Sequence, residues 1–458
     1  MSTITHEIQE ELARFIAEHP SDTGVINDHP GYSRVFDVHR WSDYPEIKAL
    51  TSDFYKLTGK VDRVSDSRCE RTLRVILINL FVNHKADPGL WTAYSRRQKD
   101  YAARSRYKCM FIELKPMTHA VDELVKLGFL DHFIGNNDKA HPESNRSSRM
   151  RPTEKLTSLF DKLGPIKTYR QPDRELISLR DENGKNKEYG KSAGKKQDST
   201  KVIGMRNHLR KINELLAKTK ISCPLTTEEI AKINRKHRDS GDPELDTDLQ
   251  TLHRVFNVNF ERGGRFYGGW WEVAPKEARQ RIKINGEETV ERDYKAMHPT
   301  MLYLHETGKP PAGDPYVLPS YAGESIMRTI VKFCFLILLN AKTREKAKGA
   351  IRKKSRDNDK LSDKAKDRLN MLDLDDVFQC IDDAHPKIAK YIGSGMGTKL
   401  QYWDSKVADK VLSSLVDKGI PCLPVHDSFI VQKQHEDDLV EAMREAFYTE
   451  WGAYPVID

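Results

Sequence analysis

The chain has 458 residues, of which 38% are hydrophobic and 31% are charged, which is typical of a protein in aqueous solution with two or three domains. Its net charge of +8 favours an anionic partner. The six cysteines contain no CxxC pair, which argues against a disulfide framework or a zinc ribbon. No apolar run approaches the roughly 20 residues of a membrane span. We therefore expect a cytoplasmic protein with no membrane partner.

Residues 1–170 are expected to form a helical region that binds nucleic acid. The stretches "CERTLRVILINLFVNHKA" and "MTHAVDELVKLGFLDHFIG" repeat apolar residues at helical spacing. A basic loop and a further apolar helix follow the second stretch, which is the order of a winged-helix module. In that module Arg146, Arg149 and Arg151 would face phosphates. An ordinary solvated loop is the alternative.

Residues 171–205 are predicted to be a charged linker, because Arg180–Lys201 is rich in Gly, Lys, Ser and Asp. Residues 206–458 are richer in Gly, aromatic and apolar side chains, and we expect the catalytic region there. A charged insertion, residues 342–370, interrupts this region. It is either a basic helical pair that binds nucleic acid or a solvated helical insertion.

Two aspartates follow predicted strands. The run "INGEETVERDY" predicts a strand ending near Asp293, and "HPTMLYLHE" predicts a helix directly after it. "IPCLPVHDSFIV" predicts a hairpin with Asp427 in its turn. Asp is also a common turn residue, so neither position alone decides a function. Together, two carboxylates on adjacent strands would hold one or two Mg²⁺ ions.

Between these aspartates lies the predicted helix "ESIMRTIVKFCFLILLNAK". Arg328, Lys332 and Asn340 fall along one of its faces because they recur at multiples of four residues. Arg328 and Lys332 would neutralise the phosphates of a nucleoside triphosphate. Extension of both side chains from a buried helix to water is the alternative.

The order of these motifs resembles that of the family A palm-domain polymerases, which include bacterial repair DNA polymerases and bacteriophage-type single-subunit RNA polymerases. "ERDYKAMHPTMLY" resembles their motif A, and "VHDSFIV" resembles their motif C. Arg328-x-x-x-Lys332 resembles their fingers helix. The match covers residues 250–440 approximately. It implies an α+β fold in which a helical N-terminal region precedes a polymerase right-hand architecture, with palm and fingers and a central antiparallel sheet.

The resemblance also implies roles for individual residues. Asp293 and Asp427 would be catalytic ligands of two Mg²⁺ ions, with Mn²⁺ able to substitute, and Lys332 would donate a proton to the leaving group. The expected nucleotide-binding residues are Arg328, Lys332, His298, Asn340 and Tyr294. The expected primer- and template-binding residues are His426, Gln401, Arg262, Arg265 and Trp270.

Arg262, Arg265 and Trp270 come from "FERGGRFYGGWWEVAPKE", and Gln401 comes from the helix before motif C. The stretch "GRFYGGWW" is similar to one in small polymerase-like proteins of phages and mobile elements. Its cations and aromatic faces could bind phosphates and stack on bases. Core packing of Trp270 and Trp271 is the alternative.

Three positions depart from the family pattern. Family A DNA polymerases carry Glu five residues after the motif A Asp, where this chain has His298. A bulky His298 would exclude ribose in the manner of the family B Tyr. Motif C reads His-Asp-Ser, as in the single-subunit RNA polymerases, and Asn340 replaces the aromatic residue at the end of the fingers helix.

We therefore expect a compact, template-directed DNA polymerase that acts in phage or mobile-element DNA replication. Its partners would be a primer–template and nucleoside triphosphates. An RNA polymerase or primase that uses ribonucleotides is the main alternative. A non-catalytic nucleic-acid-binding replication factor with a degenerate palm is the alternative from another functional class.

Overall fold

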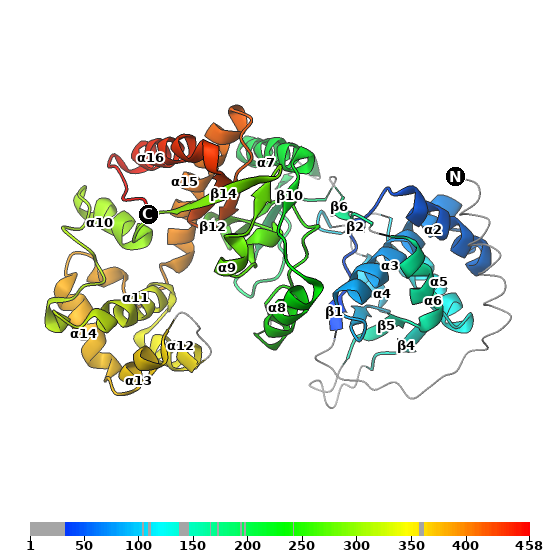
Figure 1. The fold of residues 1–458 in the computed structure, drawn as a ribbon, viewed down its shortest axis with the longest axis horizontal. Helices are drawn as coiled ribbons and strands as arrows, with labels where there is room; N and C mark the ends of the chain where they lie inside the picture. Colours follow the sequence, from blue (N-terminus) through cyan, green and yellow to red (C-terminus); the bar gives the residue numbers. More distant parts are fainter. Residues whose placement is uncertain are drawn as a thin grey trace. The chain divides into compact units, whose positions relative to one another are not determined.

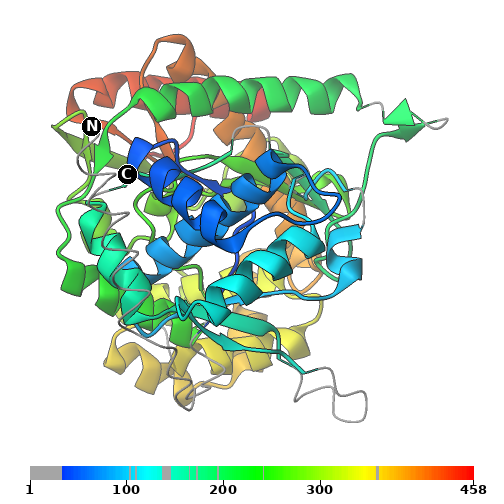
Figure 2. The same ribbon diagram turned by 90° about the vertical axis from the view of Figure 1, so that its right-hand side faces the viewer.

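The computed structural model describes residues 33–458 except 103–104, 109–110, 137–145, 165, 172–173, 193–194, 197, 241 and 357–360. The chain divides into two compact units (Figure 1), and Figure 2 shows the helices of unit 1 from a second side. Unit 1 comprises Met1–Glu175, Pro224–Thr251 and Val273–Pro275, and unit 2 comprises the remainder. This division differs from the predicted domains, because residues 224–251 belong to unit 1 and most of the predicted linker belongs to unit 2.

Unit 1 combines helices with a four-stranded sheet of order β1-β3-β5-β4, so it is less purely helical than predicted. Its helices are α2 (Pro45–Thr58), α3 (Asp66–Ala86), α4 (Gln98–Ala102), α5 (Leu114–Lys126), α6 (Glu154–Lys162) and α8 (Thr227–Ser240). Its strands are β1 (Ser33–Val35), β2 (Arg40–Trp41), β3 (Trp91–Tyr94), β4 (Leu130–Phe133), β5 (Ser148–Pro152) and β6 (Tyr169–Arg170).

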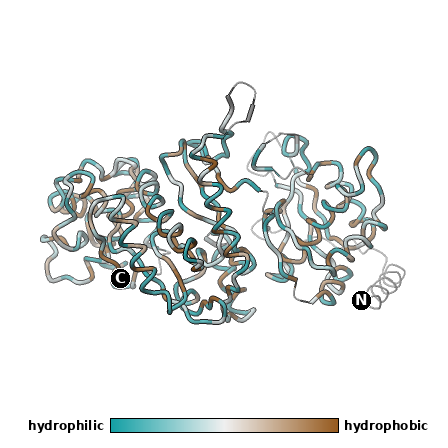
Figure 3. Tube along the Cα trace, turned by 90° about the horizontal axis from the view of Figure 1, so that it is seen from above, coloured by the Kyte–Doolittle hydropathy of each residue, from teal (hydrophilic) through white to brown (hydrophobic). Residues whose placement is uncertain are grey.

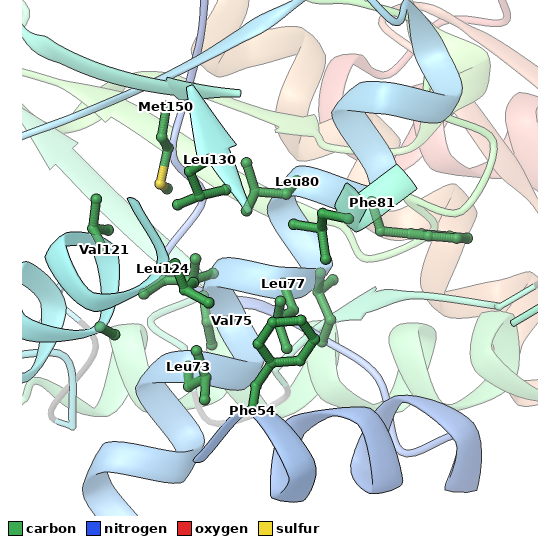
Figure 4. Close-up of a cluster of buried hydrophobic side chains, with 14 of the residues drawn as sticks. Phe54, Leu73, Val75, Leu77, Leu80, Phe81, Val121, Leu124, Leu130 and Met150 are labelled. Atoms are coloured by element: carbon green, nitrogen blue, oxygen red, sulfur yellow. The ribbon is translucent and has the colours of Figure 1, made fainter. Parts of the chain in front are cut away.

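The core of unit 1 forms where the apolar stripes of α3 and α5 meet the sheet (Figure 4). Phe54, Leu77 and Val121 are fully buried there. The second predicted helix ends at Lys126, because Gly128 adopts a left-handed φ of 75° and the following residues pair as β4. Helix α3, strand β3, helices α4 and α5 and the antiparallel pair β4–β5 follow one another along the chain.

The three arginines predicted to face phosphates in unit 1 have different environments. Arg149 is 3% exposed and packs over Phe133, and Arg151 pairs with Asp131 at 2.7 Å. Arg146 is half-buried beside Asn136, to whose side-chain oxygen its backbone N–H donates over 2.7 Å. The expected phosphate contact of Arg149 is therefore wrong for this conformation, because the side chain is buried, whereas the Arg151 side chain is 30% exposed and its phosphate contact stays a prediction.

Unit 2 contains two main sheets and most of the longer helices. Its strands are β7 (Ile177–Arg180), β8 (Lys191–Ser192), β9 (Lys195–Lys196), β10 (Ile221–Ser222), β11 (His253–Asn257), β12 (Asn259–Tyr267), β13 (Lys283–Ile284), β14 (Glu287–Asp293), β15 (Leu423–Val425) and β16 (Ser428–Gln432). Its helices are α7 (Thr200–Lys218), α9 (Lys276–Arg279), α10 (Met297–Thr307), α11 (Ser325–Asn340), α12 (Arg344–Arg356), α13 (Asp363–Asn370), α14 (Leu374–Ala384), α15 (Gly397–Asp417) and α16 (Glu436–Trp451).

The larger sheet has the order β10-β13-β14-β16-β15, and all its pairs are antiparallel. The smaller sheet has the order β12-β11-β7, and β7 runs parallel to β11. The expected α+β class is therefore confirmed at the level of mixed helices and small open sheets. The predicted linker is wrong over Ile177–Arg180, which forms a strand because its apolar residues Ile177 and Leu179 are buried.

Helices α11 to α14 gather into a helical cluster beside the larger sheet in unit 2 (Figure 1). The apolar side of α11 lies in the core of this cluster, where Ile330, Cys334 and Leu338 are fully buried. Hydrophobic and hydrophilic residues alternate along the helices, as amphipathic packing requires (Figure 3). The charged insertion is a helical pair, α12 and α13, and both readings of its sequence predicted helices.

Within the residues that the structure describes, none of the helices combines the length and the apolar character that a bilayer crossing needs.

Candidate active site

The predicted aspartates Asp293 and Asp427 lie beside each other at one end of the larger sheet. Strand β14 ends at Asp293, and Asp293 pairs with Ser428, the first residue of β16. Asp427 is the second residue of the two-residue turn between β15 and β16, and it immediately precedes Ser428. Adjacent antiparallel strands therefore bring together two carboxylates that lie far apart in the sequence, as predicted.

Two strained backbone positions flank these aspartates. His426, next to Asp427, has a φ of 60°, and Ala296, at the start of α10, has a φ of 48°. The left-handed region is disfavoured for residues other than glycine, and such residues concentrate at functional sites. At this site they direct the two chain reversals that follow β14 and β15.

The electrostatics of Asp293 reflect its crowded surroundings. The Asp293 side chain keeps solvent exposure, but the protein atoms around it partly desolvate the carboxylate, and this desolvation and after it the Asp427 carboxylate raise the pKa of Asp293 to about 7. The Lys332 ammonium opposes this shift. Two like charges held this close favour either a shared proton or a bound cation.

These two carboxylates fit a magnesium site of the open kind. Mg²⁺ is usually held by one or two carboxylates together with water and substrate phosphates, not by a cage of protein ligands. No group of three or more His, Cys, Asp or Glu side chains in the described part of the chain has the arrangement of a metal centre. Asp293 and Asp427 would hold the ion.

Further carboxylates surround Asp293 that the sequence did not predict. The backbone N–H of Asp458 donates to the carbonyl oxygen of Asp293 over 3.0 Å, so the segment Val456–Asp458 runs alongside the end of β14. Glu291, two residues before Asp293 and on the same face of the strand, also raises the pKa of Asp293. Glu291 is held by Arg279 at 2.9 Å and accepts a hydrogen bond from the Ser428 hydroxyl over 2.8 Å.

Helix α11 presents its two predicted cations differently. The Arg328 guanidinium pairs with Asp314 at 2.7 Å, whereas Lys332 is exposed and has no ion pair within the described residues. Both cations lie over the ring of Tyr316, at 5.9 and 5.8 Å from its centroid. Burial, and then the Asp427 and Asp314 carboxylates, raise the pKa of Tyr316. Tyr316 thus lies close to both cations of α11 and within electrostatic range of Asp293 and Asp427.

A buried polar network holds His298 and Arg265. Asp404 on α15 is 1% exposed and accepts two hydrogen bonds from Arg265 Nε, at 3.1 and 3.0 Å. His298 Nε2 donates to Asp404 Oδ2 over 2.8 Å. Burial is the largest single influence and favours the neutral form of Asp404, but the charge of Arg265 and the hydrogen bonds from His298 and Arg265 together outweigh it and lower the pKa of Asp404. The network fixes the His298 ring five residues after Asp293.

A close approach between β12 and α15 brings this network together. Gly264 has a φ of 87°, and a Cβ there would come within 2.6 Å of the Phe256 ring and 3.0 Å of the Ser405 hydroxyl. Only glycine therefore fits this point of the strand. Its neighbour Arg265 then reaches Asp404, and Arg265 also lies within range of the Asp427 charge.

Two predicted site residues lie elsewhere. Tyr294 is 3% exposed and donates to the Met443 carbonyl oxygen over 2.6 Å, because alternation along the strand turns it to the face opposite Asp293. Trp270 is 2% exposed, so its ring offers no face for base stacking. We exclude both from the candidate site as corrections. The Asn340 side chain is exposed and donates to the Leu336 carbonyl oxygen over 2.7 Å, and its nucleotide contact stays a prediction.

The remaining predicted residues come from β12, from α15 and from the turn between β15 and β16. Arg262 is exposed, and its Nη1 donates to the Thr398 hydroxyl over 3.1 Å in the first turn of α15. Gln401 lies one turn further along and is half-buried. The His426 ring lies 6.1 Å from that of Tyr267.

Neither the models of known protein families nor the curated proteins include one that matches this chain.

The sequence reasoning missed Asp404, although a signal was present. Leu400, Val407 and Val411 form the buried stripe of α15, and Asp404 interrupts that stripe at the same helical spacing. A lone carboxylate in an apolar stripe indicates a buried partner, because an unpaired buried charge is costly. Its partners, Arg265 and His298, come from other elements and could not be paired with it from the sequence.

Proposed function

We propose that the protein is a template-directed nucleotidyltransferase of the palm type, and that it is a DNA polymerase. The observation that carries this proposal is the juxtaposition of Asp293 and Asp427 on adjacent strands, with the Lys332 charge acting on Asp293. A carboxylate pair beside a free ammonium group suits a triphosphate with its metal ions. A hydrolytic site for neutral substrates would have no use for that cation.

Each side chain has a distinct part in this reaction. Asp293 and Asp427 would hold two Mg²⁺ ions, which supply charge stabilisation at the reacting phosphate. Lys332 contacts the triphosphate and protonates the leaving pyrophosphate. Arg328 is partly neutralised by Asp314 and serves mainly to orient the β- and γ-phosphates. The primer 3′-hydroxyl attacks the α-phosphate, and the bond to pyrophosphate breaks.

His298 is proposed to contact the sugar of the incoming nucleotide. It follows Asp293 on the first turn of α10, and Asp404 fixes its ring by a hydrogen bond of 2.8 Å. A rigid imidazole near C2′ leaves little room for a ribose hydroxyl. This supports deoxynucleotides as substrates, whereas the His-Asp-Ser turn motif favours the ribonucleotide alternative.

A primer-extension assay tests the proposal and separates these alternatives. A labelled primer on a DNA template is incubated with Mg²⁺ and either deoxynucleotides or ribonucleotides, and a third reaction omits the primer. The proposal predicts primer-dependent extension with deoxynucleotides. Ribonucleotide products without a primer would instead identify a primase or RNA polymerase.

Failure to extend has a distinct meaning. If no product forms under any condition and the primer–template still binds, the protein is a non-catalytic nucleic-acid-binding factor. The proposal of an enzyme would then be wrong, although the carboxylate pair would remain available to bind Mg²⁺.

A further inference from the structure

The outward face of α12 carries an unusual concentration of free positive charge. Ala347, Ile351 and Ser355 are buried and define the side of the helix that packs on its neighbours in unit 2. The opposite side presents four exposed cations at one- and two-turn spacings. These are Lys346, Arg352, Lys353 and Arg356, and we name them the α12 basic face.

None of these four cations has an acidic partner among the described residues. A neighbouring lysine on the same helix differs: Lys348 pairs with Glu345 at 3.0 Å and with Asp375 at 2.7 Å. Arg344, at the start of the same helix, pairs with Asp382. Acidic side chains are thus available nearby, and they neutralise Arg344 and Lys348 but none of the four cations of the α12 basic face. The α12 basic face keeps a field of one sign, which attracts a polyanion.

A glycine lies in the middle of this face. Gly349 is exposed inside a helix of 13 residues, and a Cβ built on it would meet no atom within 4 Å. Packing and backbone geometry therefore do not require glycine there, although glycine weakens a helix. Because Gly349 has no side chain, the helix surface between the four cations leaves room for the close approach of a phosphodiester backbone.

A hollow of about 290 Å³ opens beside two of these cations. Arg352 and Arg356 line it together with Ser355, Asn370 and several aliphatic side chains. Arginine side chains stack on bases and the polar groups can hydrogen-bond a base edge, so this lining suits a nucleobase. A base inside a duplex is stacked and paired, so only a single strand offers one.

We propose that the α12 basic face binds single-stranded nucleic acid, with phosphates on Lys346, Lys353 and the arginines and one base in the hollow. The inference deepens the proposed function, because a polymerase must hold an unpaired template strand. It rests on that function only for its biological meaning. The binding itself requires neither nucleotides nor catalysis.

The test uses the full chain and a fluorescein-labelled oligothymidylate of about 12 nucleotides, a usual site size for single-strand binding. The variant carries K346Q, R352Q, K353Q and R356Q. Its matched control carries K218Q, K220Q, K283Q and K309Q, which remove four exposed lysines of unit 2 from other elements. Fluorescence anisotropy gives Kd at several salt concentrations, and circular dichroism checks that both variants stay folded.

Removal of four phosphate contacts lowers the slope of log K against log salt by about 0.7 per contact for a single strand. At about 0.1 M salt the affinity should fall on the order of a hundredfold, and the control should lose much less. G349Q should weaken binding several-fold without a change in slope, because it adds bulk but removes no charge. Equal losses in the α12 variant and its control would overturn the proposal.

Two further measurements separate this inference from others. Duplex DNA that binds the α12 basic face as tightly as the oligothymidylate would contradict the single-strand assignment. Repeating the titration with Asp427→Asn separates binding from chemistry. If that variant binds normally while primer extension fails in the unmodified protein, the binding inference stands and the proposed polymerase function does not.

Discussion

The backbone N–H of Tyr294 donates a hydrogen bond to the carbonyl oxygen of Asp427 over 3.4 Å. The bond ties the residue after Asp293 directly to the turn that carries the second aspartate. The Tyr294 side chain, packed among Phe429 and Phe447, anchors the same point in the core. The two carboxylates are therefore positioned by main-chain pairing and by packing, and they do not depend on flexible loops.

The pKa of Asp293 predicts how metal affinity varies with pH. Since partial desolvation and Asp427 raise this pKa from 3.8 to about 7, a proton competes with the metal below pH 7. We expect Mn²⁺ affinity, measured by titration calorimetry, to rise between pH 6 and pH 8. The Asp427→Asn variant should show a weaker rise, because it removes the neighbouring charge. A pH-independent affinity would contradict this account.

The raised pKa of Asp293 also makes the stability of the fold depend on pH. Metal affinity rises with pH, whereas this contribution to stability falls. Between pH 3.8 and about 7 the folded state holds a proton on Asp293 that the unfolded state releases. The contribution of this group to the free energy of unfolding is therefore greatest at low pH and falls as the pH rises to about 7. Urea titrations should show that Asp293→Asn removes this part of the pH dependence. An unchanged pH dependence would contradict it.

Lys332 should matter more than Arg328 for the chemical step. Lys332 is exposed and carries the charge that acts on Asp293, whereas Arg328 already pairs with Asp314. We expect Lys332→Gln to lower kcat by about a hundredfold, the lower range for loss of a general acid. Arg328→Gln should mainly raise KM for the nucleotide. Steady-state extension kinetics measure both, with Lys309→Gln as a control. An unchanged kcat in Lys332→Gln would exclude its role as the acid.

Asp404 should be a stability residue as well as a positioning residue. Replacement by Asn leaves the Arg265 guanidinium buried without its carboxylate, which costs about 3–5 kcal/mol. The control is Asp314→Asn, which breaks a more exposed ion pair and should cost about 1 kcal/mol or less. Urea unfolding gives both values. Similar values for the two variants would show that the Arg265–Asp404 pair is not buried as described.

His298 should determine the sugar preference. Its replacement by Ala removes the imidazole that Asp404 holds in place and opens space beside the sugar. We expect ribonucleotide incorporation relative to deoxynucleotide incorporation to rise by about ten- to a hundredfold, as for other changes in the fit of a small group. Competitive extension reactions measure this ratio. An unchanged ratio would show that another residue selects the sugar.

Local patterns predicted the parts of the site that lie within single elements. The strand ending at Asp293, the turn holding Asp427 and the helix of Lys332 each follow from periodicity and turn chemistry over a few residues. The sequence could not show which face of β14 bears the site, so Tyr294 was wrongly included. Contacts from distant segments were also hidden.

The buried network illustrates this second limit. Arg265, His298 and Asp404 come from β12, α10 and α15, and only the folded arrangement brings them together. Trp270 shows a related difficulty: the same aromatic residue suits a core or a stacking surface, and burial decides between them. The boundary between the units was missed because residues 224–251 return to unit 1 after the chain has entered unit 2.

The central claim is that Asp293 and Asp427 form the metal site of a polymerase. The most direct test is Mg²⁺-dependent primer extension by the unmodified protein, by Asp427→Asn and by the control Asp438→Asn. The control alters an aspartate of α16 that pairs with Lys418. We predict that the unmodified protein and the control extend the primer at similar rates. Primer extension by Asp427→Asn should be slower by at least about a hundredfold, since loss of a residue that merely hydrogen-bonds a metal ligand can already lower activity by that factor. Extension that survives in Asp427→Asn, or fails in the folded unmodified protein, would contradict the claim.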